Sequence, residues 1–160
     1  MTEQMTLAEM GQALHASQQA FLEMMDRVDD ETLYQQIGAE NWTLAETLVH
    51  MAEARQFFVG ETRKALAAPQ VAIGRTVENE ARLKNIEEHG RDALATIRQR
   101  MLESHTAMIA LLQEINDDQL ALQVEHVAYG PQSLGAFLQR FFIGHDQAHV
   151  QQAKELLGSE

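Results

Sequence analysis

The sequence predicts an all-α protein that folds as a four-helix bundle. Apolar residues recur mostly at helical spacing, only two prolines occur in 160 residues, and the one extended piece that the pattern allows is brief. A hydrophobic content of 45% is enough for a sizeable buried core. The length suits a single helical bundle domain over residues 1–160.

The first helix is expected from Leu7 to Val28. Thr6 can cap it, and Glu9 stands three residues later, which completes a capping box. Apolar residues follow at i, i+3 and i+4 spacing along the segment. A polar connection is expected over residues 29–42.

The second helix is expected to begin after Thr43, with Glu46 as the partner in a second capping box. It should run to about Ala68, because Pro69 cannot continue it. A loop over residues 69–78 and a short helical piece over 79–88 are expected next, the latter ending near Gly90.

The third helix is expected from about Asp92 to Ile115. The stretch 116–132 is irregular, with a brief extended piece over Leu122–Val127. Ser133 then caps the last helix, which runs from Leu134 to about Leu157 before a stop at Gly158.

The last helix carries two histidines one turn apart. On a wheel of about 100° per residue, one narrow apolar stripe contains Leu134, Leu138, Phe141, His145, His149, Gln152 and Leu156. Asp146 points away from this stripe, so we expect it to face solvent or another subunit; a hydrogen-bonding partner of the histidines is the alternative.

Two imidazoles on one buried face are well placed to bind a single metal ion. The alternative is a pair of histidines that are hydrogen-bonded within the core or at its edge. His50 lies at the edge of the apolar stripe of the second helix, a position that permits an inward imidazole without requiring one.

Two segments of the chain together resemble the DinB-like metal-binding superfamily, which includes the YfiT-type proteins. The first segment is Trp42-Thr43-Leu44-Ala45-Glu46 followed by His50-Met51, and the second is Gly130-Pro131-Gln132-Ser133-Leu134 followed by His145-Asp146-Gln147-Ala148-His149-Val150-Gln151-Gln152. The sequence departs from the family pattern at Arg55, where an acidic residue is frequent, and at Ala153, where a larger apolar residue is usual.

The resemblance implies a DinB/YfiT-like bundle in which His50, His145 and His149 hold a divalent metal ion, zinc or nickel. It also implies a metal-dependent enzyme of hydrolase or low-molecular-weight-thiol S-transferase type, with catalytic residues that the sequence does not identify. A non-catalytic metal-binding or stress-response protein is the alternative, and a helical protein with a vestigial site is a third. Because ligation requires neutral imidazoles, metal affinity should fall below the ordinary histidine pKa of about 6.5.

Other residues are weaker candidates for the site. Glu53, one turn from His50, is an alternative fourth ligand or base. His126 is near enough to the last helix to approach the metal, although an ordinary loop histidine is the favoured interpretation. His15, His89 and His105 share no spacing with the three histidines and are expected at the surface.

Charge and composition limit the partners. With 12 basic and 24 acidic residues the net charge is −12, which disfavours nucleic acid and anionic membranes. A small-molecule substrate and a homodimer are expected instead. The chain has no cysteine, and its first residues lack the pattern of a secretory signal, so we expect a cytoplasmic protein.

Overall fold

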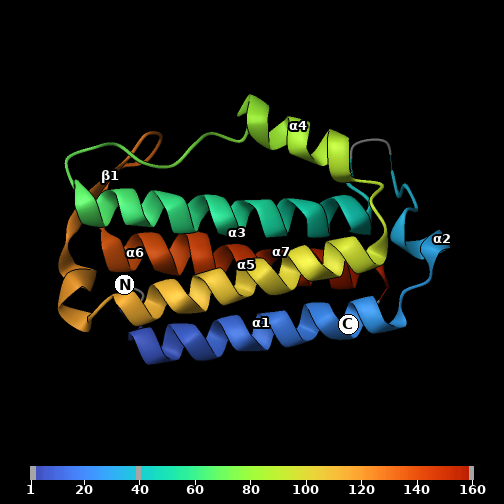
Figure 1. Ribbon diagram of the computed structural model, residues 1–160, viewed down its shortest axis with the longest axis horizontal. Coiled ribbons are helices and arrows are strands. Elements are labelled where there is room, and N and C mark those ends of the chain that lie inside the picture. Colours follow the sequence, from blue (N-terminus) through green and yellow to red (C-terminus); the bar gives the residue numbers. More distant parts are fainter. Residues whose placement is uncertain (1–2, 39–40, 159–160) are drawn as a thin grey trace.

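Four helical segments run side by side in the computed structural model, which describes residues 3–38 and 41–158 (Figure 1). They are α1 (Leu7–Arg27), α3 (Leu44–Ala67), α5 (Leu94–Glu114), and a final segment composed of α6 (Leu134–Leu138), η2 (Gln139–Gly144) and α7 (His145–Leu156). The shorter elements are α2 (Asp30–Leu33), α4 (Glu80–His89), η1 (Asp117–Ala121), β1 (Gln123–His126) and β2 (Gly130–Ser133). The predicted four-helix bundle is confirmed, and no helix in the described segments could cross a lipid bilayer.

Side-chain caps begin the main helices where the sequence predicts them. The Thr6 hydroxyl accepts the N–H of Glu9, and the Glu9 carboxylate accepts the N–H of Thr6, which completes the first capping box. The Thr43 hydroxyl accepts the N–H of Glu46, but the Glu46 carboxylate makes no bond back to the Thr43 N–H, so the second predicted capping box is only half formed. The Ser133 hydroxyl accepts the N–H of Ala136. These local signals explain why the starts of α1, α3 and α6 agree with expectation.

Three short elements, α2, η1 and β2, were not predicted. The region 29–42, expected to be a polar connection, contains α2, which is capped by the Asp29 side chain. The expected extended piece becomes strand β1, which pairs antiparallel with the unpredicted strand β2. Such short pieces depend on partners elsewhere in the chain, as the bridge between Ile73 and His126 illustrates.

The final helical segment is interrupted by a π-helix, η2, in which backbone bonds run from i to i+5. Its one extra residue per turn rotates the following residues by roughly 100° relative to a continuous α-helix. Asp146 therefore lies on the buried face, together with Ala153, and is only 1% exposed. The prediction that Asp146 faces solvent or another subunit is wrong for this reason.

The interior consists of two apolar clusters separated by a layer of polar side chains. One cluster includes Leu14, Phe58, Met108 and Phe137, and the other includes Phe21, Leu48, Met101 and Ala153. Between them, the polar layer is made of one buried residue from each long helical segment: Gln18, Arg55, Ser104 and Asp146. The three histidines lie beside this layer on α3 and α7.

Candidate metal centre

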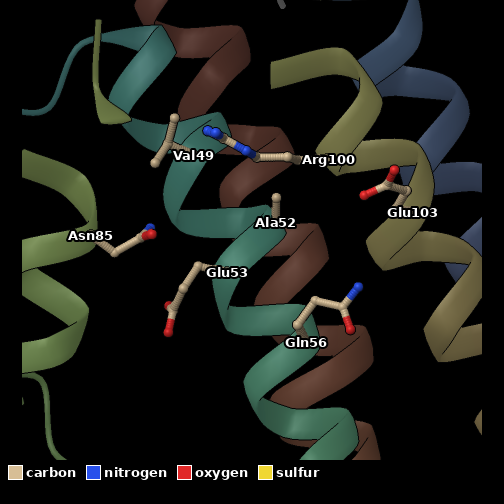
Figure 2. A pocket seen from close by; sticks show the side chains of 7 residues that line it. All are labelled: Val49, Ala52, Glu53, Gln56, Asn85, Arg100 and Glu103. Carbon is tan, nitrogen blue, oxygen red and sulfur yellow. The ribbon is translucent and has the colours of Figure 1, made fainter. Parts of the chain in front are cut away.

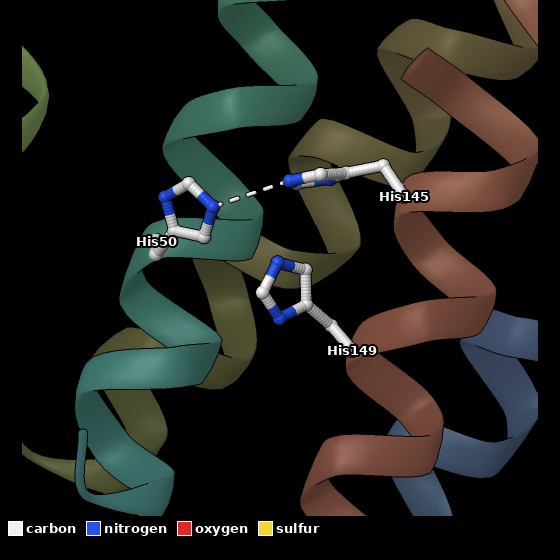
Figure 3. Close-up of side chains that lie close together, drawn as sticks. All are labelled: His50, His145 and His149. Atoms are coloured by element: carbon white, nitrogen blue, oxygen red, sulfur yellow. Dashed lines mark hydrogen bonds between the residues drawn. The ribbon is translucent and has the colours of Figure 1, made fainter. Parts of the chain in front are cut away.

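His50, His145 and His149 converge between α3 and α7, as Figure 3 shows. One ring nitrogen from each histidine lies within 4.8 Å of the corresponding nitrogen of the other two. The Nε2 atoms of His50 and His145 are 3.2 Å apart. The structure thus brings together the three histidines that the sequence singles out.

Burial keeps these imidazoles neutral. Loss of hydration lowers the pKa of His50 to about 2 and that of His145 to about 3, with smaller contributions from neighbouring imidazoles and arginines. Burial also lowers the pKa of His149, although its bond to Gln152 and the charge of Asp146 oppose the shift. Each neutral ring therefore has a nitrogen lone pair available to a metal ion at neutral pH. Protons should compete with the ion for these nitrogens only well below a pH of about 6.5, the value expected for ordinary histidines.

Gln152 orients one of the three rings. The Nδ1 atom of His149 lies 2.6 Å from the amide oxygen of Gln152, one turn further along α7. An amide oxygen only accepts hydrogen bonds, so Nδ1 carries the proton and Nε2 is left as the free lone pair. A bond of this kind is the usual device by which a protein fixes the tautomer of a metal-binding histidine.

The geometry fits a small divalent ion with nitrogen ligands. Tetrahedral ligands at a zinc–nitrogen distance of about 2.0–2.1 Å are separated by roughly 3.3 Å. Here the Nε2 atoms of His50 and His145 are 3.2 Å apart and share a hydrogen bond, and all three candidate ligand atoms lie within 4.8 Å of one another. Among the described residues, no fourth histidine, aspartate or glutamate joins the group. Three imidazoles suit ions such as zinc or nickel better than magnesium or calcium, and they leave coordination positions for other molecules.

Aromatic rings surround the three histidines. Trp42 stacks against His149, with ring centroids 6.4 Å apart, and lies 4.9 Å from the His50 ring. Phe58 meets the His145 ring edge to face at 5.7 Å. These contacts restrict the imidazole orientations and limit the access of water.

A cavity of about 370 Å³ opens beside the cluster. This volume is in the range of small-molecule sites. Its lining consists of His50, Ala54, Phe58, Arg75, Thr76, Val77, Arg82, Ala128, Tyr129, Phe141, His145 and His149. The cluster is therefore accessible to a ligand through a largely apolar chamber that carries two arginines.

Glu53, the predicted alternative ligand or base, forms an ion pair with Arg75 instead. Its two carboxylate oxygens accept hydrogen bonds from Nη1 and Nη2 of Arg75, each at 2.6 Å. It also lines a separate cavity of about 180 Å³ between α3, α4 and α5, where Figure 2 shows it with Asn85 and Arg100. The lining of that second cavity contains no histidine among the described residues, so it adds nothing to the candidate ligand set of His50, His145 and His149.

His126 lies in strand β1 and is 1% exposed, so the expectation of an ordinary loop histidine is wrong. Its Nδ1 accepts the N–H groups of Ala128 and Tyr129. Its ring stacks on Phe141 with centroids 4.9 Å apart. His126 thus supports the aromatic wall of the cavity from behind and is not part of the three-histidine group.

The loop that carries Arg75 passes very close to His126 at Gly74. A Cβ atom at Gly74 would lie 2.2 Å from Nε2 of His126, and the residue has a φ of +89°. Both conditions require glycine. The Gly74 N–H donates to the Glu61 carboxylate at 2.8 Å, so the loop is tied to α3 immediately before Arg75.

Arg55, where the sequence departs from the family pattern, is the centre of the polar layer. Its guanidinium binds Asp146 through two hydrogen bonds and also donates to Gln18 and Ser104. Burial raises the pKa of Asp146, and the charge of Arg55 opposes that shift. Asp146 adjoins His145 in sequence, so this ion pair anchors the helix that carries two of the three histidines.

The remaining histidines lie apart from the cluster. His15 is exposed, and its Nδ1 is 3.1 Å from Nε2 of His105. His105 is half-buried, and burial lowers its pKa to about 4, so the surface position expected for it is only partly correct. His89 is near the end of α4 and bonds to Asp92.

Comparison with known sequences identifies one family. The family model described as the DinB superfamily matches residues 13–153. No relative is found among curated protein sequences.

Several solved structures share the fold at low sequence identity. YfiT from Bacillus subtilis, described as a probable metal-dependent hydrolase with an unusual four-helix bundle topology, is 16% identical with a TM-score of 0.75, over 96% of this chain and 89% of that one. A mycothiol-dependent maleylpyruvate isomerase is 16% identical with a TM-score of 0.76, over 94% of this chain and 62% of that one. The colibactin self-resistance protein ClbS, solved with double-stranded DNA, is 12% identical with a TM-score of 0.72, over 95% of both chains. At these identities the likeness concerns the fold alone.

Proposed function

Because the chain belongs to the DinB superfamily, we propose that it is a metal-dependent enzyme in which His50, His145 and His149 hold one divalent ion, zinc or nickel. The single observation that carries this proposal is the convergence of three ring nitrogens within 4.8 Å of one another. The lowered pKa values of all three histidines support it, because metal ligation requires neutral imidazoles.

The adjoining cavity favours catalysis over metal storage. Three protein ligands leave coordination positions for a substrate or a nucleophile, and the cavity of about 370 Å³ provides the room. When bound, such an ion supplies Lewis-acid chemistry that activates water or a thiol near neutral pH. Phe58, Phe141 and Tyr129 line the chamber and limit the water around the reacting atoms.

We propose hydrolysis or transfer of a low-molecular-weight thiol as the reaction class. YfiT is described as a probable metal-dependent hydrolase, and the maleylpyruvate isomerase depends on mycothiol. A small-molecule substrate suits the cavity, whereas a net charge of −12 disfavours nucleic acid as a ligand. The homodimer, the lack of nucleic-acid and membrane partners, and the cytoplasmic location stay predictions.

Metal analysis of untagged protein tests the proposal. Metal-free protein would be incubated with zinc, nickel or cobalt, passed over a desalting column, and measured by elemental analysis. About one ion per chain is expected. Trace metal alone after exposure to each ion would contradict the proposal.

The optical spectrum of the cobalt-loaded protein then distinguishes an open site from a closed one. Addition of a small thiol should change the spectrum if coordination positions face the cavity. If the protein binds one cobalt ion per chain but its spectrum does not change on addition of the thiol, the non-catalytic metal-binding alternative is favoured.

A further inference from the structure

Two arginines line the same cavity as the three histidines. Arg75 comes from the loop between α3 and α4, and Arg82 from the first turn of α4. Among the described residues that line this cavity there is no aspartate or glutamate. The described lining of the cavity that contains the histidines therefore carries cations and no carboxylate, within a chain of net charge −12.

Arg75 is already neutralised. Its two terminal nitrogens bind both oxygens of Glu53 at 2.6 Å. Its guanidinium lies over the Phe57 ring, 4.0 Å from the centroid. A bidentate ion pair stacked on an aromatic ring is a fixed structural unit, which leaves Arg75 little capacity to bind a further anion.

Arg82 is the available cation. It is half-buried, its Nη1 donates to the Val77 carbonyl at 2.8 Å, and its guanidinium lies 5.1 Å from the Trp42 ring centroid. In the described part of the chain, no carboxylate forms an ion pair with it. Burial lowers the pKa of Arg82, but a guanidinium in a protein stays protonated. A partly dehydrated cation with unused donors gains free energy when a ligand supplies the anion.

We propose that Arg82 recognises the substrate by binding a carboxylate, and that the apolar body of this organic acid packs against Phe58 and Phe141 beside the three histidines. The proposal rests on the proposed function, since it names the substrate class of the same site. The lining beside Arg82 is largely apolar and aromatic, which suits the hydrocarbon body of an organic acid with one carboxylate. The planar fork of the guanidinium also matches the two oxygens of a carboxylate.

The test uses Trp42 as a reporter. Trp42 is the only tryptophan in the chain, so nitrogen-15-labelled protein gives a single indole N–H signal next to Arg82. Benzoate and benzamide, which have the same shape and differ in charge, would be titrated into metal-free and zinc-loaded protein. Benzoate should bind about tenfold tighter than benzamide or better, as expected for a charge-assisted hydrogen bond worth at least about 1.4 kcal/mol.

Variants assign the preference to Arg82. Arg82→Gln should bring the ratio of benzoate to benzamide affinity close to one, while zinc stoichiometry stays unchanged. Arg82→Lys keeps the charge but loses the planar fork, so its preference for benzoate should be reduced. This variant replaces Arg82→Gln in the test if the glutamine variant does not fold. Lys84→Gln removes an equal charge from the exposed face of the same helix and should behave like the parent protein.

The two proposals fail in distinguishable ways. Absence of zinc binding would contradict the proposed function, whereas the benzoate preference of the metal-free protein still tests Arg82. Equal binding of the two probes by the parent protein, or an undiminished preference in Arg82→Gln, would overturn the role of Arg82. The second result would indicate that the carboxylate binds elsewhere, for example at the ion.

Discussion

The Arg55 guanidinium binds the Asp146 carboxylate inside the bundle, with Nε 3.2 Å from Oδ1 and Nη2 2.8 Å from Oδ2. Both side chains are 1% exposed. The remaining guanidinium nitrogen, Nη1, donates to Gln18 at 2.9 Å and to Ser104 at 3.4 Å, so a single arginine connects all four long helical segments. This ion pair leaves no charge in the polar layer without a partner.

Removal of one partner should be far more destabilising than removal of both. Asp146→Leu leaves the Arg55 charge buried and uncompensated, which should cost about 3–5 kcal/mol of the free energy of unfolding. The double variant with Arg55→Met should lose less than the sum of the single variants, because no unpaired charge remains. Urea denaturation of the metal-free proteins at neutral pH measures each value.

The exposed pair of Arg63 and Glu114 is the matched control for this comparison. Both side chains are 51% exposed, so Arg63→Met should leave the free energy of unfolding almost unchanged. A loss for Asp146→Leu as small as that of the control would contradict the structural importance of the buried pair.

The three histidines should lose metal binding as one unit. Each of His50→Ala, His145→Ala and His149→Ala should weaken metal affinity by more than the 10–100-fold expected when an outer partner is removed. Effects of double variants should not add, because residues that share one ion fail together. Competition with a chelator measures affinity, and circular dichroism checks helicity.

His15→Ala is the control for the histidine series, since His15 is exposed and outside the cluster. It should bind metal like the parent. If His50→Ala kept the parental affinity, the site would need a ligand set other than the one proposed.

Gln152 should influence metal affinity without touching the ion. Gln152→Ala removes the acceptor that holds Nδ1 of His149 at 2.6 Å, so the ring is free to rotate or change tautomer. Affinity should fall about 10–100-fold. Gln151→Ala, at the exposed neighbouring position, should change nothing. Equal affinities of the two variants would show that the hydrogen bond does not orient the ligand.

Stability of the metal-free protein should fall on acidification. The folded pKa values of His50 and His145, about 2 and about 3, are below the unfolded value of about 6.5. Below pH 6.5 the unfolded chain therefore binds protons that the folded chain does not. The stability is fully present above that pH and is lost toward pH 3, by up to about 1.4 kcal/mol per pH unit for each histidine.

Denaturant unfolding at a series of pH values measures this slope. His50→Gln removes one such group and should make the slope shallower by about one proton. A stability that stays constant between pH 6.5 and 4.5 would mean that the imidazoles are more hydrated than their burial indicates.

Local signals in the sequence are sufficient to predict where several helices begin. The Thr6 and Glu9 capping box and the Ser133 cap depend on residues three apart, and the structure contains both. The expected helix 79–88 likewise corresponds to α4, which is capped by Asn79. Such features could be predicted because every interacting partner lies within one turn.

Features that depend on distant partners could not be predicted in this way. Asp146 was misplaced because a helical wheel assumes a constant rotation per residue, which the π-helix breaks. The burial of His126 depends on Gly74, which is 52 positions earlier in the chain and leaves space for the ring. The pairing of Glu53 with Arg75 depends on the path of the loop that follows α3. The convergence of His50 with the other two histidines was inferred from family resemblance, because spacing alone left its inward position open.

The π-helix also sets how this protein can tolerate insertions and deletions. Loss of one residue between 139 and 144 would let an ordinary α-helix form, which is locally favourable. It would also turn His145, Asp146 and His149 by roughly 100° relative to Leu134 and Phe137. Either the apolar cluster around Phe137 would then be packed differently, or the three histidines would no longer converge. In this segment the number of residues is therefore under stronger constraint than their identity, and length variation among functional variants should be confined to the loops.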